Sequence, residues 1–308
     1  MQVASQQLLD AVDKAEKKLA IFNNTDKLPT VLSRIRKFFN SPYQYTIHNL
    51  IKLGLISSSD VTITTFWGKK MVLPISDENV VAPYYTGILG IIENSLTRYL
   101  IANLKENDIF YDLGANYGFY TGLASHLIKN GEIHSFEPSL LAFNYLQKNF
   151  SSDKKVFLNQ CAVSDGSSQT LVFYDSSSKN KAAMGTIVKE VVQHNPFGYK
   201  EVSVPAISLD AYIKSHRPPT IMKIDVEGSE SMVIKGASSL LEGGTVIAME
   251  IWCTSHVYER TKEAIKLLQQ KGYKAYKILP NGSLKYEENL NPIKEKVGQF
   301  NIYIFKRD

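Results

Sequence analysis

The alternation of strand-like and helix-like segments after residue 108 constrains the fold of this chain more than any other feature. Short runs rich in β-branched and aromatic residues predict seven strands, at 109–113, 132–136, 156–160, 220–225, 246–251, 273–278 and 299–305. Amphipathic segments predict helices at about 119–129, 140–150, 209–215, 229–240 and 258–270. Parallel strands joined by such helices form a doubly wound, mostly parallel α/β sheet. The last two strands have no helix between them, which predicts an antiparallel strand at the C-terminal end, at one edge of the sheet.

The residues before position 60 are expected to form a small helical region, so we predict two domains, 1–59 and 60–308. Five apolar residues recur there at helical spacing: Leu8, Val12, Ala15, Leu19 and Phe22. Such a face suits a helix packed on its own domain, or a homodimer through the N-terminal helices. The segment between Pro29 and Pro42 mixes basic and aromatic residues; a helix docked by its aromatics is the simpler interpretation, and peripheral membrane contact is the alternative. Residues 61–66 and 71–75 predict a β-hairpin.

The composition excludes several classes of protein. Of the 308 residues, 44% are hydrophobic and 21% are charged, which is typical of a globular protein and not of a disordered or collagen-like chain. The net charge is only +5 and no Lys/Arg block occurs, so we expect no nucleic-acid partner. The two cysteines, Cys161 and Cys253, form no CxxC motif. We recognise no signal peptide and no transmembrane segment, and therefore expect a cytoplasmic protein.

A glycine-containing turn follows the first predicted strand, and it has the sequence Asp112-Leu113-Gly114-Ala115-Asn116-Tyr117-Gly118. Gly114 and Gly118 permit a sharp turn and a close approach of a ligand. The dinucleotide fingerprint would need a glycine at position 116, where this chain has Asn116. An acidic residue at the strand end, Asp112, suits a ligand with an ammonium or sulfonium charge and disfavours a pyrophosphate.

The second strand ends in Phe136-Glu137-Pro138. Glu137 lies about 20 residues after the glycine turn, where an acidic side chain can accept hydrogen bonds from both hydroxyls of a ribose. The turn and the carboxylate together indicate a nucleoside ligand. The structural alternative is a tight turn followed by a carboxylate that caps a helix.

Acidic residues also gather where the fourth and fifth strands end. Lys223 and Asp225 alternate onto one face of a central strand. A buried lysine needs a carboxylate partner, and Asp112, Asp225 and Glu250 are the candidates. Glu227 follows in the next loop. The alternative to a functional site is an ion-pair network that orders this edge of the sheet.

These motifs resemble those of the FkbM-type methyltransferases, a family of class I S-adenosylmethionine (SAM) methyltransferases. The resemblance covers about residues 61–305 and is carried by four stretches: Gly90-Ile91-Ile92-Glu93, the turn 112–118, Phe136-Glu137-Pro138 and Met222-Lys223-Ile224-Asp225-Val226-Glu227-Gly228-Ser229-Glu230. It implies a seven-stranded Rossmann-like sheet and SAM as the cofactor.

The resemblance also implies a role for individual residues. The methionine part of SAM would lie against the turn residues Gly114, Ala115, Asn116 and Gly118, and Asp112 would bind its amino group. Glu137, with Pro138 beside it, would bind the ribose. Cys161 and Ala162 would lie near the adenine, although many class I enzymes have an acidic residue there.

The implied reaction is methyl transfer to a hydroxyl of a sugar, a glycan or a glycosylated natural product. A general base assists such a reaction because an alcohol is a poor nucleophile at neutral pH. Glu227 or Asp225 is the expected base, and His256 is a third candidate. We expect no metal. Part of the acceptor pocket is expected in the long insertion at 175–200. The alternatives are a nicotinamide-dependent oxidoreductase, against which Asn116 counts, and a non-catalytic nucleoside-binding module.

Overall fold

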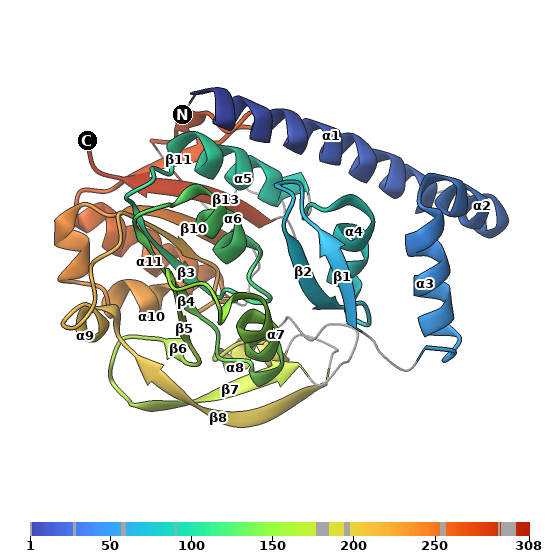
Figure 1. Cartoon of the computed structure of the whole chain (residues 1–308). Helices are drawn as coiled ribbons and strands as arrows, with labels where there is room; N and C mark the ends of the chain where they lie inside the picture. The colour runs from blue at the N-terminus through green and yellow to red at the C-terminus, as the bar shows by residue number, and fades with distance from the viewer. Residues whose placement is uncertain are drawn as a thin grey trace. The chain divides into compact units, whose positions relative to one another are not determined.

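The structure is a computed structural model that describes residues 2–26, 29–56, 60–89, 91–176, 185–193, 198–252, 257–288, 290 and 300–308. The chain divides into two compact units, one formed by Met1–Asn94 and the other beginning at Ser95. Figure 1 labels their helices and strands. The predicted domain boundary near residue 60 is a different boundary from the one between these units, and it stays a prediction.

The first unit combines helices with a β-hairpin. Its elements are α1 (Gln2–Asp26), α2 (Thr30–Asn40), α3 (Pro42–Lys52), β1 (Asp60–Thr64), β2 (Lys70–Pro74), α4 (Glu78–Thr86) and the start of α5 (Ile91–Asn103). Helix α1 packs against α4 and α2, and Val12, Ala15 and Leu19 of the predicted apolar face are buried. The predicted hairpin is confirmed, because β1 and β2 pair antiparallel with Ile63 opposite Met71. Among the described residues, no helix is long and apolar enough to cross a membrane.

Helix α2 differs from the simpler interpretation of its sequence. A helix docked by its aromatic residues would bury Phe38 and Phe39, but both rings are exposed and α2 has no buried residue. That interpretation is therefore wrong for this helix, since periodicity shows which residues share a face and not whether another element covers it.

The second unit is built on a large, mostly parallel sheet. Its strands are β3 (Ile109–Leu113), β4 (Glu132–Phe136), β5 (Val156–Asn159), β9 (Ile221–Ile224), β10 (Val246–Trp252), β11 (Lys274–Ile278), β12 (Leu284–Tyr286) and β13 (Phe300–Lys306). Within the described residues their order is β12-β11-β13-β10-β9-β3-β4-β5, which makes eight strands where seven are predicted. The additional strand is β12, which extends β11 as a hairpin too short to be recognised in the sequence. The C-terminal strand is antiparallel, as predicted, but it lies between β10 and β11 and not at an edge.

Helices cover both faces of this sheet. They are the end of α5, α6 (Phe119–Leu127), α7 (Leu140–Phe150), α9 (Leu209–Tyr212), α10 (Glu230–Lys235) and α11 (Tyr258–Gln270), with a short 3₁₀ turn at Leu240–Gly243. Helix α8 (Lys189–Gln193) belongs to the insertion between β7 and β8. One face of the sheet carries Tyr111, Met222 and Met249, which pack with residues of α9, α10 and α11 in the main apolar core. The opposite face carries Asp112 and Lys223, which are partners in the pairing of β3 with β9.

A small second sheet interrupts the βα alternation between β5 and β9. It consists of β6 (Ala162–Val163), β7 (Thr170–Ser176) and β8 (Tyr199–Ile207), in the order β6-β8-β7. Strands β7 and β8 pair antiparallel from Thr170 opposite Pro205 to Ser176 opposite Tyr199. They are therefore the stem of the insertion that the sequence places at 175–200.

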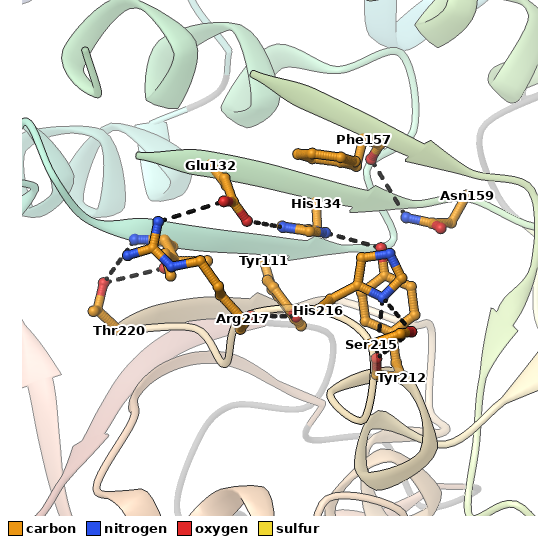
Figure 2. Close-up of polar contacts among 11 residues, drawn as sticks. Tyr111, Glu132, His134, Phe157, Asn159, Tyr212, Ser215, His216, Arg217 and Thr220 are labelled. Carbon is orange, nitrogen blue, oxygen red and sulfur yellow. Dashed lines mark hydrogen bonds and ion pairs between the residues drawn. The ribbon is translucent and has the colours of Figure 1, made fainter. Parts of the chain in front are cut away.

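A buried polar network joins α9 to the sheet on the main-core face (Figure 2). His134 of β4 is fully buried, and its ring stacks on Phe157 of β5 at a centroid distance of 4.5 Å. Its Nδ1 lies 2.8 Å from the hydroxyl of Tyr212, and its Nε2 lies 3.2 Å from Oε2 of Glu132. Burial lowers the pKa of His134, so the ring is neutral, accepts from Tyr212 and donates to Glu132. The network holds β4, β5 and α9 together.

Candidate functional site

The turn after β3 is held in a conformation that only a few residues adopt. Gly114 has a φ of 72°, Asn116 of 51° and Gly118 of 90°. A Cβ on Gly114 would lie 1.8 Å from the carbonyl oxygen of Asp225, and one on Gly118 would lie 2.4 Å from the ring of Phe150. The sequence suggests that these glycines make room for a ligand; the structure shows that packing against the protein itself already requires them.

Glu137 connects this turn to the end of β4. Its Oε2 accepts a hydrogen bond of 2.8 Å from the backbone N–H of Asn116, and its Oε1 accepts one of 2.8 Å from the backbone N–H of Ser139. The side chain is buried, and burial raises the pKa of Glu137 to about 7 despite these two bonds. Each carboxylate oxygen retains a lone pair for a further donor.

Two buried oxygen atoms near the turn lack a hydrogen-bond partner within the described part of the chain. They are Oδ1 of Asp112 and Oδ1 of Asn116. Among the described residues, Oδ1 of Asp112 has only the longer ion pair with Lys223, at 3.6 Å. A buried acceptor without a hydrogen bond is costly, so such atoms indicate a place where a ligand supplies the donors. The donor set of a nucleoside with an amino group, an ammonium and ribose hydroxyls, matches these acceptors and Glu137.

Lys223 is the buried cation at the centre of this edge of the sheet. Its Nζ lies 3.1 Å from Oδ2 of Asp225, 3.6 Å from Oδ1 of Asp112 and 3.2 Å from the carbonyl oxygen of Gly114. Burial alone would lower the pKa of Lys223, but Asp225 and then Asp112 more than offset this and raise it. The prediction that Lys223 has a carboxylate partner is confirmed.

The loop after β9 presents Glu227 in a strained conformation. Glu227 has a φ of 54°, which is rare for a residue with a side chain, and its carbonyl oxygen accepts a hydrogen bond of 2.8 Å from Oγ1 of Thr186. Ser229 Oγ donates to the carbonyl of Val226 at 2.9 Å, and the N–H of Gly228 donates to Oε1 of Glu230 at 3.1 Å. Strain of this kind persists where the surroundings enforce it, which is typical of functional loops.

Three carboxylates, Asp225, Glu227 and Glu230, crowd around this loop. Burial raises the pKa of Glu227 well above its ordinary value, and the charges of Asp225 and Glu230 raise it further. Burial also raises the pKa of Glu230 to about 7, and its Oε2 has no hydrogen-bond partner within the described residues. A carboxylate with a raised pKa is a stronger base than an exposed one.

The remaining predicted site residues lie in different surroundings. Ala162 belongs to β6 and packs with Phe173 and Val204, and Cys161 is partly buried against the main core, where burial raises its pKa to about 12. Pro138 is half-buried beside Glu137, and Ala115 is buried in the turn. His256 lies outside the described residues, as do Gly90 and the side chains of Ile91–Glu93.

Sequence reasoning missed several residues of this site. Thr121 of α6 donates a hydrogen bond of 2.7 Å to Oδ2 of Asp112, and Ser139 donates one of 3.0 Å to Oδ1 of Asp175. Glu230 could have been found from the sequence, because it stands three residues after Glu227 in the stretch Met222–Glu230.

Comparison with known proteins adds to this geometry. A family model described as "Methyltransferase FkbM domain" matches residues 112–275, which include the turn, Glu137 and the Asp225–Glu230 loop. The hexuronic acid methyltransferase AglP of Haloferax volcanii is 26% identical over 180 residues, covering 58% of this chain and 68% of AglP. The methyltransferase sdnD of Sordaria araneosa is 24% identical over 202 residues, covering 57% of this chain and 77% of sdnD.

Solved structures resemble the chain only distantly. Fibrillarin of Aeropyrum pernix, solved with bound S-adenosyl-L-methionine, has 14% identity and a TM-score of 0.40 over 80% of this chain and 94% of its own. An O-methyltransferase of Bacillus cereus has 11% identity and a TM-score of 0.40 over 74% and 86%. Both values are too low to support a comparison of sites.

Proposed function

Because the chain belongs to the FkbM methyltransferase family, we propose that it transfers a methyl group from SAM to a hydroxyl of a sugar, a glycan or a glycosylated natural product. The observation that carries the use of SAM is the pairing of Glu137 with the Asn116 turn, beside Oδ1 of Asp112 and Oδ1 of Asn116, which accept no hydrogen bond among the described residues. The sugar acceptor is supported by the similarity to a hexuronic acid methyltransferase.

The residues present fit SAM. Glu137 would bind the ribose hydroxyls, and Asp112 and Asn116 would accept from the amino group and its surroundings. Gly114, Ala115 and Gly118 would supply the backbone that lies along the methionine part, while Pro138, Cys161 and Ala162 would lie toward the base. When bound, SAM supplies a methyl group that its sulfonium charge makes electrophilic.

Glu227 is the residue best suited to remove the proton from the acceptor hydroxyl. Its pKa is raised, so it holds a proton more strongly than an exposed glutamate does. Asp225 is the second candidate, but Lys223 lies 3.1 Å from its Oδ2 and competes for its lone pairs. His256 is the third. Positioned proton transfer of this kind contributes about 10²–10⁴-fold to a rate.

The insertion between β7 and β8 supports an acceptor pocket beside Glu227. Thr186, at its described end, donates its hydroxyl proton to the Glu227 carbonyl. Val188 and Val191 of the insertion pack with Val257. Val257 lies close to Gly228, since a Cβ added to Gly228 would be 2.9 Å from the Val257 side chain. The insertion therefore contacts the loop that carries the proposed base, and it would exclude water from an acceptor held there.

Two measurements test the proposal. Calorimetric titration should show binding of SAM and none of NAD, since Asn116 replaces the glycine that a dinucleotide needs. Incubation with labelled SAM and a hexuronic acid glycoside should transfer label to a hydroxyl. Binding of NAD alone would support an oxidoreductase, and binding of SAM without transfer to any sugar acceptor would support a non-catalytic module.

A further inference from the structure

Helix α2 has the opposite arrangement from a helix that packs into a globular core. Its half-buried positions are polar: they are Ser33 and Lys37, and the ammonium of Lys37 lies 4.9 Å from the ring of Phe22 on α1. With 3.6 residues per turn, the apolar residues at 31, 32, 35, 38 and 39 share an arc about 120° wide on the exposed side. The contacts with α1 therefore use the polar face and leave the apolar face in water.

The exposed apolar surface continues into α3 and the residues after it. The ring of Phe38 lies 6.0 Å from that of Tyr45, which joins α2 to α3. Of the fourteen large apolar side chains that are exposed among the described residues, eight lie in residues 29–56: Val31, Leu32, Ile35, Phe38, Phe39, Tyr43, Leu53 and Leu55. We call residues 29–56 the α2–α3 segment. A patch of this kind marks an interaction site, because monomeric proteins rarely leave so much apolar surface together.

The net positive charge of the whole chain is concentrated at the same place. Residues 27–59 contain five basic residues, Lys27, Arg34, Arg36, Lys37 and Lys52, and no acidic residue. The chain has 35 basic and 30 acidic residues, so the rest of it has 30 of each and is neutral. On α2 the positions of Arg34 and Arg36 flank the apolar arc on its two sides. Long basic side chains in that position reach past an apolar face to anionic groups.

From these observations we infer that the α2–α3 segment docks on the surface of an anionic lipid bilayer. An apolar arc bordered by cations is the chemistry of helices that lie in the membrane interface. A second copy of this chain fits less well, because a two-fold interface would bring the same cations together without any acidic residue to pair with them. A nucleic acid would use the cations but leave the apolar arc uncovered.

Vesicle flotation with the full chain tests this inference without any measurement of methyl transfer. We expect the protein to float with vesicles of phosphatidylcholine and phosphatidylglycerol at about 7:3 and not with phosphatidylcholine alone. Arg34→Gln/Arg36→Gln should weaken binding roughly 30-fold, because each cation near an anionic surface contributes about a fivefold factor. Ile35→Ser/Phe39→Ser should abolish binding, because it removes the apolar residues that would enter the bilayer. Both side chains are exposed, so circular dichroism should show an unchanged fold.

The matched control is Lys17→Gln/Lys18→Gln, which removes the same charge from exposed positions on α1. It should change vesicle binding by less than about threefold, since those lysines border no apolar arc. Equal loss in the control, equal binding to both kinds of vesicle, or no binding at all would overturn the inference. Light scattering that shows a dimer abolished by Ile35→Ser/Phe39→Ser, without vesicle binding, would assign the surface to a second copy instead.

Discussion

The backbone N–H of Asn116 donates a hydrogen bond of 2.8 Å to Oε2 of Glu137, and this bond joins the turn after β3 to the end of β4. The two residues follow neighbouring strands, since Leu113 and Phe136, the last residues of β3 and β4, are partners in their pairing. The same carboxylate that would bind a ribose therefore also fixes the turn that would hold the rest of the nucleoside.

Glu137→Gln should weaken SAM binding by about 10- to 100-fold, the range of a hydrogen bond to a charged group. The amide keeps one oxygen, but its NH₂ would face the donor of either Asn116 or Ser139, so the turn should also loosen. Titration calorimetry measures the change in affinity. Glu106→Gln, an exposed glutamate before β3, is the control and should bind SAM as the natural protein does. Equal affinity of the two variants would remove Glu137 from the binding site.

Glu227→Gln should lower kcat by about 10²–10⁴-fold and leave SAM affinity within a few-fold. The substitution preserves shape, so the left-handed backbone of the loop is kept. Because Glu227 must be ionised to accept a proton, kcat of the natural enzyme should rise with pH through its raised pKa, and the variant should lack that rise. Asp225→Asn provides the comparison: if it removes the rise and Glu227→Gln does not, Asp225 is the base.

Glu230→Gln should stabilise the protein at alkaline pH. The pKa of Glu230 is raised by burial from 4.5 to about 7, so between these values the folded state holds a proton that the unfolded state has lost. The natural protein therefore loses stability as pH rises through this window. At pH 8 its Tm should be several degrees below that of the variant. The difference in the free energy of unfolding is at most about 3 kcal/mol. Both differences should shrink below about pH 5. A difference that is independent of pH would contradict the prediction.

Gly114→Ala should destabilise the protein far more than a positive φ explains. Gly272 is the matched control, because its φ of 79° is close to the 72° of Gly114. A Cβ added to Gly272 would have no atom within 4 Å, whereas one added to Gly114 would lie 1.8 Å from the carbonyl oxygen of Asp225. Gly272→Ala should cost about 1–2 kcal/mol, the backbone penalty alone. Gly114→Ala must in addition displace the carbonyl of Asp225, so its urea midpoint should be clearly the lower of the two. Similar midpoints would show that the turn shifts without cost.

Much of the candidate site could be predicted from the sequence because strand geometry is regular. Side chains alternate along a strand, and parallel neighbours place equivalent positions together. Lys223 and Asp225 could therefore be assigned to one face, and Asp112 to the strand end beside them. The glycines of the turn were recognisable too, although the reason for Gly114, the close approach of Asp225, depends on a residue 111 positions away.

Other features depend on contacts that no local pattern contains. The bond between Ser139 and Asp175 joins α7 to β7 across 36 residues, and β6 has only two residues, too few for a recognisable period. The amphipathic pattern of α2 was visible, but the sequence could not show that its polar side would be the half-buried one. Whether another element covers a helix face is decided by the tertiary structure. The expectation that the aromatic residues of α2 dock against the protein was therefore wrong.

The place of β13 has a consequence for how the protein is made. Strand β13 pairs with β10 on one side and β11 on the other, and Tyr303 and Phe305 are buried. During synthesis β10 and β11 leave the ribosome first. Each can pair with its other neighbour, β9 or β12, but the edge that faces β13 stays open until residues 300–306 have emerged. For that interval the nascent chain exposes two open strand edges, which are natural targets for chaperones and for aggregation. The closing of this half of the sheet thus waits for residues 300–306 and comes after β10 and β11 have been made.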